Sequence, residues 1–460
     1  MVVARCSRFA PGVAVHCDSG RSSGCVQTDV VTTARDGQDS TESLASTSSP
    51  DPPSRPVRTA TFASLANPTY RLLFFSGAVS FLAVQAQFVA RGWLANDLTG
   101  TNAGLGAVYM AFGVPMLLAT PFGGVLADRL SKRNILLTTQ VALGASALWI
   151  GLGVQFDFVE YWMLLVTSAV QAIAFSFLAP ARMAMTSELV GRELLTNAIV
   201  LGQMSMNSTR VIGPALAGVG IGVAWFGLAG VYFASAAVSV LGFAMLLPLP
   251  SSRRERVGPG RSPGREFVDG LRYVRGRPDI GWLVVTSFVV VMVAFPYVAF
   301  LPRVATEIFD VGPAGFGAMS AVGAVGAVLM SLYVARRTNG LETWRTQTFA
   351  GIGFGVGLLL VAVSPSYLAV LGAIFLVGAA ASGFQSMNNS LVLGLAEFEF
   401  HGRMQSLMML SFSGFGMAAL PLGLLADVIG LRQTIGVMGV TALLAMATYL
   451  TVRPPPTPTI

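Results

Sequence analysis

The sequence predicts an all-α integral membrane protein with twelve transmembrane helices in two six-helix repeats. Three observations lead to this fold class: the composition, a succession of long apolar segments, and a similarity between the two halves. Of the 460 residues, 53% are hydrophobic and 11% are charged, whereas soluble domains have roughly 25% charged residues. So little charge cannot cover a soluble surface. It excludes a nucleic-acid-binding protein despite the net charge of +7, and it argues against a hydrolase or a metalloenzyme.

Residues 1–65 differ in composition from the rest of the chain. They are rich in Ser, Thr, Asp, Arg and Pro and contain no long apolar run. Such a segment buries too little surface to offset its chain entropy, so we expect a disordered tail. It contains all three cysteines, whose spacing matches no zinc pattern and favours unpaired thiols over a metal or redox cluster; they are Cys6, Cys17 and Cys25. A transit peptide and an over-long start remain alternatives for this tail.

From Leu72 onward, apolar segments alternate with short polar breaks. A helix needs about 20 apolar residues to cross the hydrocarbon core. Glycine and proline are frequent inside the segments, as is normal where membrane helices pack closely. The twelve predicted spans are 71–95, 103–127, 134–155, 161–186, 196–221, 226–249, 280–304, 313–335, 346–364, 367–394, 405–428 and 432–452.

Basic residues mark one set of connecting loops, and acidic residues mark the opposite set. The first set includes the loop around Lys132, the only lysine, and the connection 250–279 with its eight arginines. Loops such as 96–102 and 305–312 lack basic residues but carry Asp97, Glu307 and Asp310. The excess of Lys and Arg marks cytoplasmic loops. We therefore expect a plasma (inner) membrane protein with both termini in the cytoplasm.

The connection 250–279 divides the chain into its domains. Its first part is a flexible basic linker. In its second part Phe267, Leu271 and Val274 follow helical spacing, which predicts an amphipathic helix at the membrane surface; a merely solvated linker is the alternative. The predicted organisation is a tail (1–65), a first bundle (66–249), the linker (250–279), a second bundle (280–453) and a C-terminal tail (454–460).

The two bundles resemble each other in sequence. Residues 103–106 (AGLG) recur as 314–317 (AGFG), an offset of 314 − 103 = 211 residues. Gly191-Arg192 recurs as Gly402-Arg403 with the same offset. Six helices per unit and an equal direction imply parallel repeats about an axis along the membrane normal, which is one architecture of secondary transporters.

The loop between the second and third predicted spans carries the most specific motif. It reads GVLADRLSKR over residues 124–133 and resembles the signature of the major facilitator superfamily, with Ser131 where glycine is usual. Gly124 permits close helix packing. The resemblance implies that Asp128 sits at the positive N-terminus of the eleventh span, which starts near Gln405.

The basic residues of the same loop suggest a conformational latch between the two bundles. They can pair with carboxylates of adjacent loops, such as Glu188 or Glu193. The alternative is a loop that only sets the membrane orientation. The predicted latch consists of Gly124, Asp128, Arg129, Lys132 and Arg133.

The fifth predicted span contains RVIGPALAG over residues 210–218. Its core is similar to the Gly-Pro motif of antiporters in the superfamily, and Gly213, Pro214 and Gly218 allow a bend and close packing. The segments 87–99 and 197–218 look like the branch that contains siderophore and drug exporters. The resemblance covers residues 68–452 and implies a secondary exporter that works by alternating access and proton antiport. An uptake carrier on the same fold is the alternative.

Polar residues inside the spans fall on single helical faces. Such residues are costly in a membrane and usually line a cavity or join helices. The predicted substrate cavity contains Gln87, Arg91, Gln171, Asn207, Arg210, Tyr297, Gln385 and Asn389. For the amides, joining helices is an equal alternative, whereas a lone arginine in a membrane span favours function.

Acid–base and metal chemistry have few candidates in this sequence. No Asp or Glu lies deep in a predicted span, so the candidates for proton coupling are Asp97, Glu307 and Asp310. Two histidines and the absence of a Walker sequence argue against an enzyme and against direct use of ATP. We expect no cofactor and no metal. The expected partners are a small-molecule substrate and the lipid bilayer, without nucleic acid, and the expected state is a monomer.

Overall fold

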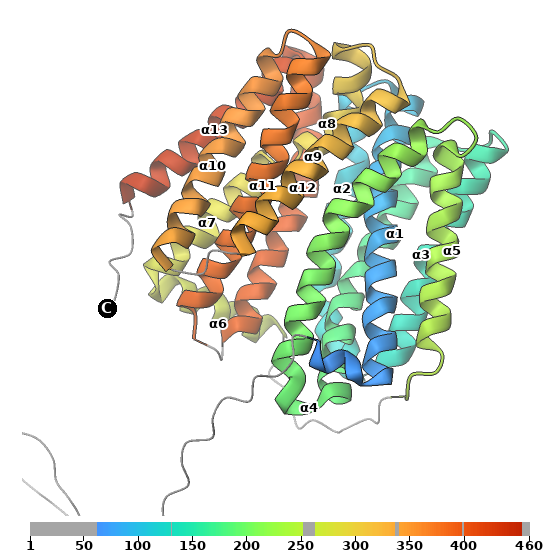
Figure 1. The fold of residues 1–460 in the computed structure, drawn as a ribbon, viewed down its shortest axis with the longest axis vertical. Helices are drawn as coiled ribbons and strands as arrows, with labels where there is room; N and C mark the ends of the chain where they lie inside the picture. Colours follow the sequence, from blue (N-terminus) through green and yellow to red (C-terminus); the bar gives the residue numbers. More distant parts are fainter. Residues whose placement is uncertain (1–61, 130, 252–262, 336–339, 398–399, 453–460) are drawn as a thin grey trace, which may run out of the picture. The chain divides into compact units, whose positions relative to one another are not determined.

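A computed structural model describes residues 62–129, 131–251, 263–335, 340–397 and 400–452. Every long element in these ranges is a helix (Figure 1). The predictions for residues 1–61, including the cysteines, and for 454–460 lie outside the described residues. The elements of residues 62–251 are η1 (Ala63–Ala66), α1 (Pro68–Thr99), α2 (Asn102–Arg129), α3 (Lys132–Gln155), α4 (Tyr161–Gly222) and α5 (Gly227–Leu246).

The remaining elements begin with α6 (Pro263–Gly276), which occupies the second part of the predicted linker. They continue with α7 (Pro278–Val293), α8 (Tyr297–Arg303), η2 (Val304–Ile308), α9 (Pro313–Ala335), α10 (Gly340–Val363), α11 (Tyr367–Leu395), α12 (His401–Ile429) and α13 (Leu431–Val452). Below, the first half means residues 66–249 and the second half means residues 280–453.

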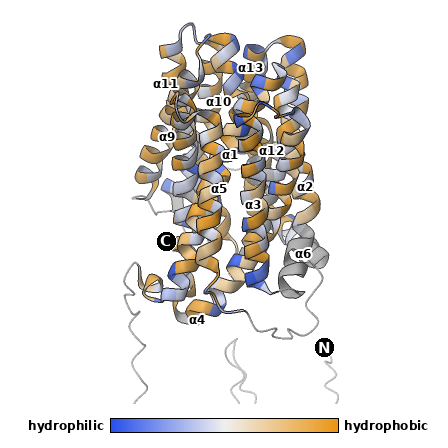
Figure 2. Ribbon diagram, turned by 90° about the vertical axis from the view of Figure 1, so that its right-hand side faces the viewer, coloured by the Kyte–Doolittle hydropathy of each residue, from blue (hydrophilic) through white to orange (hydrophobic). Residues whose placement is uncertain are grey.

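Ten helical stretches among the described residues are long and apolar enough to cross a membrane, and Ser413–Ile429 is a shorter apolar stretch. Figure 2 shows apolar residues along most of the helix length. Large apolar side chains face outward, such as Phe349 (72% exposed) and Leu444 (61% exposed), because lipid rather than water covers this surface. The structure confirms a multi-span helical membrane protein but does not confirm the number of twelve spans.

Two predicted elements differ from the structure. The sequence separates spans 161–186 and 196–221 by a loop. In the structure both segments belong to α4, which is helical before and after Gly191 and changes direction at this residue, with φ 68° and ψ 175°. Glycine adopts a positive φ at little cost, so a single residue replaces the predicted loop. The span 280–304 is broken into α7, α8 and the π-helical turn η2, because Pro296 and Pro302 lack the N–H of a continuous helix.

The helices have two chemically different ends. We call the end that carries Asp97, Asp157, Glu160, Glu307 and Asp310 the acidic end and the opposite end the basic end. Hydrogen bonds join neighbouring helices near the acidic end: Tyr161 donates to the carbonyl of Gly104 at 2.8 Å, and Tyr367 donates to the carbonyl of Gly315 at 2.7 Å.

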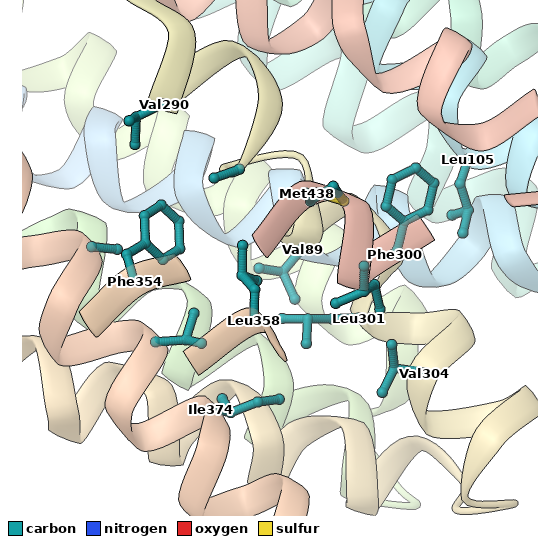
Figure 3. Packing of buried hydrophobic residues seen from close by; sticks show 14 of the residues in the cluster. Val89, Leu105, Val290, Phe300, Leu301, Val304, Phe354, Leu358, Ile374 and Met438 are labelled. Carbon is teal, nitrogen blue, oxygen red and sulfur yellow. The ribbon is translucent and has the colours of Figure 1, made fainter. Parts of the chain in front are cut away.

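Helices of the two halves pack directly on each other, α2 on α12 and the part of α4 after Gly191 on α9. Gly113 meets Gly416 in the first pair, and Gly218 meets Gly317 in the second. The largest cluster of buried apolar residues also crosses between the halves (Figure 3). It joins Val89 and Leu105 to residues of α8 and η2 such as Phe300, Leu301 and Val304.

Candidate functional site

A buried polar cluster joins α1 to α4 in the first half. Arg91 Nη2 donates to Gln171 Oε1 at 2.5 Å, and Gln171 Nε2 donates to Gln87 Oε1 at 3.4 Å. Gln87 and Arg91 are four residues apart, so they share one face of α1, and that face meets α4. Each of the three side chains is at most 2% exposed. The chain thus holds a guanidinium group and two amides together inside the helical bundle.

Several donors of this cluster have no hydrogen-bond acceptor among the described residues. They are Arg91 Nε, Arg91 Nη1 and Gln87 Nε2. Two phenol groups lie within electrostatic range of Arg91: Tyr109, which donates to the carbonyl of Phe88 at 3.2 Å, and Tyr232, whose hydroxyl also has no described partner. A buried cation without a counter-charge is costly, so this group of donors is suited to an anion or to a strong hydrogen-bond acceptor.

The other predicted cavity residues lie on other helices. Gln385 and Asn389 are half-buried on α11, and Arg210 is half-buried on the part of α4 after Gly191. Tyr297 begins α8 and meets Phe354 edge-on, with 5.9 Å between ring centroids. The side chain of Asn207 lies outside the described residues. Within the described part of the chain, hydrogen bonds do not link the Arg91 cluster to Gln385 or Asn389, so a single cavity shared by both halves stays a prediction.

Sequence reasoning missed Arg182, an arginine in the part of α4 before Gly191. Arg182 Nη1 donates to the carbonyl of Leu73 at 2.7 Å and to Ser76 Oγ at 3.4 Å, and its guanidinium group lies against Gly77. Its Nε and Nη2 have no acceptor among the described residues. The signal was available, because Arg182 follows Gln171 by eleven residues, about three turns, and therefore lies on the same face of α4.

Side chains of the segment that carries the predicted latch are described only from Ser131 onward. Ser131 Oγ accepts from the backbone N–H of Asn134 at 3.2 Å, so the residue that departs from the family pattern caps α3. Lys132 pairs with Glu188 of α4. Arg133 donates to the carbonyls of Leu246 and Leu247 at 3.4 and 2.5 Å, at the end of α5. The side chains of the other three predicted latch residues lie outside the described residues; they are Gly124, Asp128 and Arg129.

The Gly-Pro segment of α4 lies against the second half. A methyl group on Gly218 would lie 2.9 Å from Gly317 Cα, and one on Gly222 would lie 3.0 Å from Ala314 Cα. Gly213 is buried against Gln85 of α1, with Pro214 beside it. Small residues here therefore permit direct backbone packing between α4 and α9.

The three acidic residues considered for proton coupling are exposed at the acidic end. Glu307 pairs with Arg303 at 2.7 Å, one turn away along the chain. Asp310 has a φ of 50°, in the left-handed region that Asp tolerates better than most residues. Their role in coupling stays a prediction.

Comparisons with known proteins agree with this architecture. A family model described as "Major Facilitator Superfamily" matches residues 73–421. The staphyloferrin A transporter of Staphylococcus aureus is 21% identical over 81% of this chain and 93% of its own length. The multidrug efflux pump Tap of Mycolicibacterium fortuitum is 28% identical over 75% of this chain and 86% of its own length.

Solved structures show the same fold. The crystal structure of a bacterial homolog of the human lysosomal transporter Spinster superimposes with a TM-score of 0.66. The match covers 85% of this chain and 98% of that chain at 14% identity. These relatives and structural neighbours are transporters rather than enzymes.

Proposed function

Because the chain belongs to the major facilitator superfamily of membrane transporters, we propose that it exports small organic molecules with an anionic or strongly accepting group. The observation that carries the proposal is the buried Arg91 cluster, whose guanidinium group keeps two nitrogens without a described acceptor. The molecules act as monomers in this proposal, and the two halves move relative to each other to alternate access.

The chemistry of Arg91 supports an acidic substrate. A guanidinium group presents five N–H donors in a planar fork that matches a carboxylate. Arg91 uses one nitrogen toward Gln171, and Gln87 Nε2 lies in the same cluster without an acceptor. A carboxylate, hydroxamate or phenolate of a substrate would supply the missing acceptors and the counter-charge. A permanent cation would instead be repelled.

The direction of transport is inferred from relatives and from the Gly-Pro segment. One relative is named a staphyloferrin A transporter and the other a multidrug efflux pump. The segment around Pro214 is similar to the motif of antiporters, and it packs on α9 of the other half. Together they favour export over uptake, which is the alternative on the same fold.

Proton antiport and orientation complete the proposal. The basic end faces the cytoplasm with both termini, and the acidic end faces outward in the plasma membrane. Asp97, Glu307 and Asp310 then face the medium outside the cell, and the external pH determines the proton concentration around them. Alternatively, the charge of the substrate itself couples transport to the membrane potential.

Transport by everted membrane vesicles tests these statements. We expect uptake of acidic compounds into everted vesicles that is lost when the ion gradients are collapsed. Arg91→Gln should abolish this transport, because it removes the charge, and Arg91→Lys should reduce it, because it keeps the charge without the fork. Arg71→Gln is the matched control, since Arg71 lies on the same helix but is exposed.

Three results would contradict the proposal. Transport of permanent cations alone, with Arg91→Gln fully active, would refute the anionic substrate. Accumulation that persists without any ion gradient would refute secondary active export. Uptake into right-side-out vesicles would support the alternative, an uptake carrier.

A further inference from the structure

Asp427, near the end of α12, binds the first turn of α2 in the other half of the chain. Its Oδ1 accepts hydrogen bonds from the backbone N–H and the side-chain Nδ2 of Asn102, both at 2.9 Å. Its Oδ2 accepts from the backbone N–H of Ala103 at 2.8 Å. The first N–H groups of a helix lack partners inside the helix and carry partial positive charge. A carboxylate from a residue 325 positions away therefore caps α2.

The backbones of α2 and α12 approach closely enough to permit this bond. A methyl group on Gly423, one turn before Asp427, would lie 3.1 Å from Ala103 Cα. Further along the same pair, a methyl group on Gly416 would lie 2.6 Å from Gly113 Cα. Glycine at these positions brings the end of α12 against the start of α2, and any larger residue would hold the carboxylate away from the N–H groups.

The sequence around Asp427 repeats the motif of the loop between α2 and α3. Residues 423–427 read GLLAD, and residues 124–128 read GVLAD. In both copies the residue three positions after the aspartate is small, and the residue five positions after it is an arginine. These residues are Gly430 and Arg432 in one copy, and Ser131 and Arg133 in the other.

The two arginines also make equivalent contacts. Arg432 Nη1 donates to the carbonyls of Ala362 and Ser364 at 3.1 and 2.8 Å, at the end of α10. Arg133 donates to the carbonyls of Leu246 and Leu247 at the end of α5. A shared sequence with a shared arginine contact indicates two copies of one structural motif, one at each end of the helical bundle.

Other contacts between the halves also lie toward the acidic end. Trp93 of α1 stacks on Phe316 of α9, with ring centroids 5.1 Å apart, and Asn96 donates to Thr306 at 3.4 Å. The charged group that faces Asp427 is Arg303, which is itself paired with Glu307 at 2.7 Å. The halves are thus in contact toward the acidic end, and separating α2 from α12 there requires the three hydrogen bonds of Asp427 to break.

We propose that Asp427 and the first turn of α2 form a second latch, which holds the acidic end closed and releases when that end opens. The three donors require an ionised carboxylate, because a protonated acid turns one of its oxygens into a donor that faces another N–H group. The latch is therefore present while Asp427 is ionised, and it is lost only when the pH at the acidic end falls below the ordinary pKa of an aspartate, roughly 4. This inference depends on no substrate and no direction of transport.

Distances between spin labels at the acidic end test the latch. Trp225 in the first half and Leu368 in the second are 86% and 79% exposed near this end. Both are replaced by labelled cysteines in the full chain, after serine replaces the three native cysteines of the tail. Double electron–electron resonance in lipid nanodiscs, without substrate or gradient, then reports the ratio of closed to open acidic ends, so the result is separate from any test of export.

We expect a graded series of variants. Asp427→Ala should lower the closed-to-open ratio about tenfold, since it removes a charged acceptor from a helix N-terminus. Asn102→Ala keeps both backbone donors and should have a smaller effect. Asp157→Asn is the matched control, an exposed acidic-end residue at φ 56°, which Asn also tolerates. It should leave the ratio unchanged.

Two outcomes would overturn the proposal. The latch is refuted if folded Asp427→Ala, or Asp427→Asn should the alanine variant not fold, gives the distance distribution of the parent protein. Lowering the pH from 7.5 to about 3, below the ordinary pKa of an aspartate of roughly 3.9, should move the parent toward open distances and should leave Asp427→Asn unaffected. An equal response of both proteins to pH would refute the requirement for an ionised Asp427.

Discussion

Replacing Gly113 with alanine should push the acidic ends of the two halves apart. Gly113 lies on α2 where this helix crosses α12. An added methyl group would lie 2.8 Å from Gly416 Cα and 2.9 Å from both Gly416 C and Met417 N. All three atoms belong to the backbone, so no flexible side chain can move aside, and the strain must be relieved by separation of the helices.

The size of the effect follows from these distances. Carbon atoms that are not bonded to each other prefer about 3.5–4.0 Å, so the helices must separate by roughly 0.7 Å (3.5 − 2.8) to reach the short end of that range. Overpacking of this kind costs about 1–3 kcal/mol. Because α2 and α12 part when the acidic end opens, the cost falls on the closed state and should shift the equilibrium about 5- to 150-fold toward the open state.

The distance between labels on Trp225 and Leu368 measures this shift. The control is Gly372→Ala, because among the described residues a methyl group on Gly372 would meet no atom within 4 Å outside the backbone of its own helix. Both substitutions bring the same gain of about 1 kcal/mol in helix propensity, so their difference isolates the contact between the helices. If the two variants gave the same closed-to-open ratio, close packing at Gly113 would not control the acidic end, and the reasoning would be wrong.

Two further predictions concern the cap of α3 and the N-terminal tail. Ser131→Ala removes the side-chain cap of α3 and should lower the free energy of unfolding by about 1 kcal/mol. Chemical denaturation in detergent measures this change. Ser131→Asp should restore the stability, and a loss of stability in both variants would contradict a capping role. A membrane-impermeant maleimide should label the parent protein in everted vesicles but not in intact cells, because we place the tail inside; the opposite pattern would invert the orientation. The reactive residues are Cys6, Cys17 and Cys25.

Hydropathy located the helices because a membrane span must be long and apolar whatever packs against it. The predicted spans 134–155 and 432–452 correspond to Lys132–Gln155 and Leu431–Val452. The errors fall where one residue changes the backbone. Gly191 replaced a predicted loop by a turn within α4, and Pro296 broke a span that the apolar pattern makes continuous.

The sequence predicted only part of the candidate site. Helical spacing placed Gln87 and Arg91 on one face of α1, since that depends on the helix alone. It could not tell whether this face meets Gln171 of α4 or Gln385 of α11. The structure pairs it with Gln171, because α1 and α4 pack side by side within the first half.

Asp427 shows the same division most clearly. The sequence by itself determined the spans, the basic and acidic connections, the family motif and the polar faces, because each follows from residues close together in the chain. Only the tertiary structure decided that an aspartate at the end of α12 caps α2, 325 residues earlier. Hydropathy and periodicity describe one helix at a time, whereas the partner of a charged group depends on which helix ends meet, and glycine contacts such as Gly113–Gly416 bring these two together.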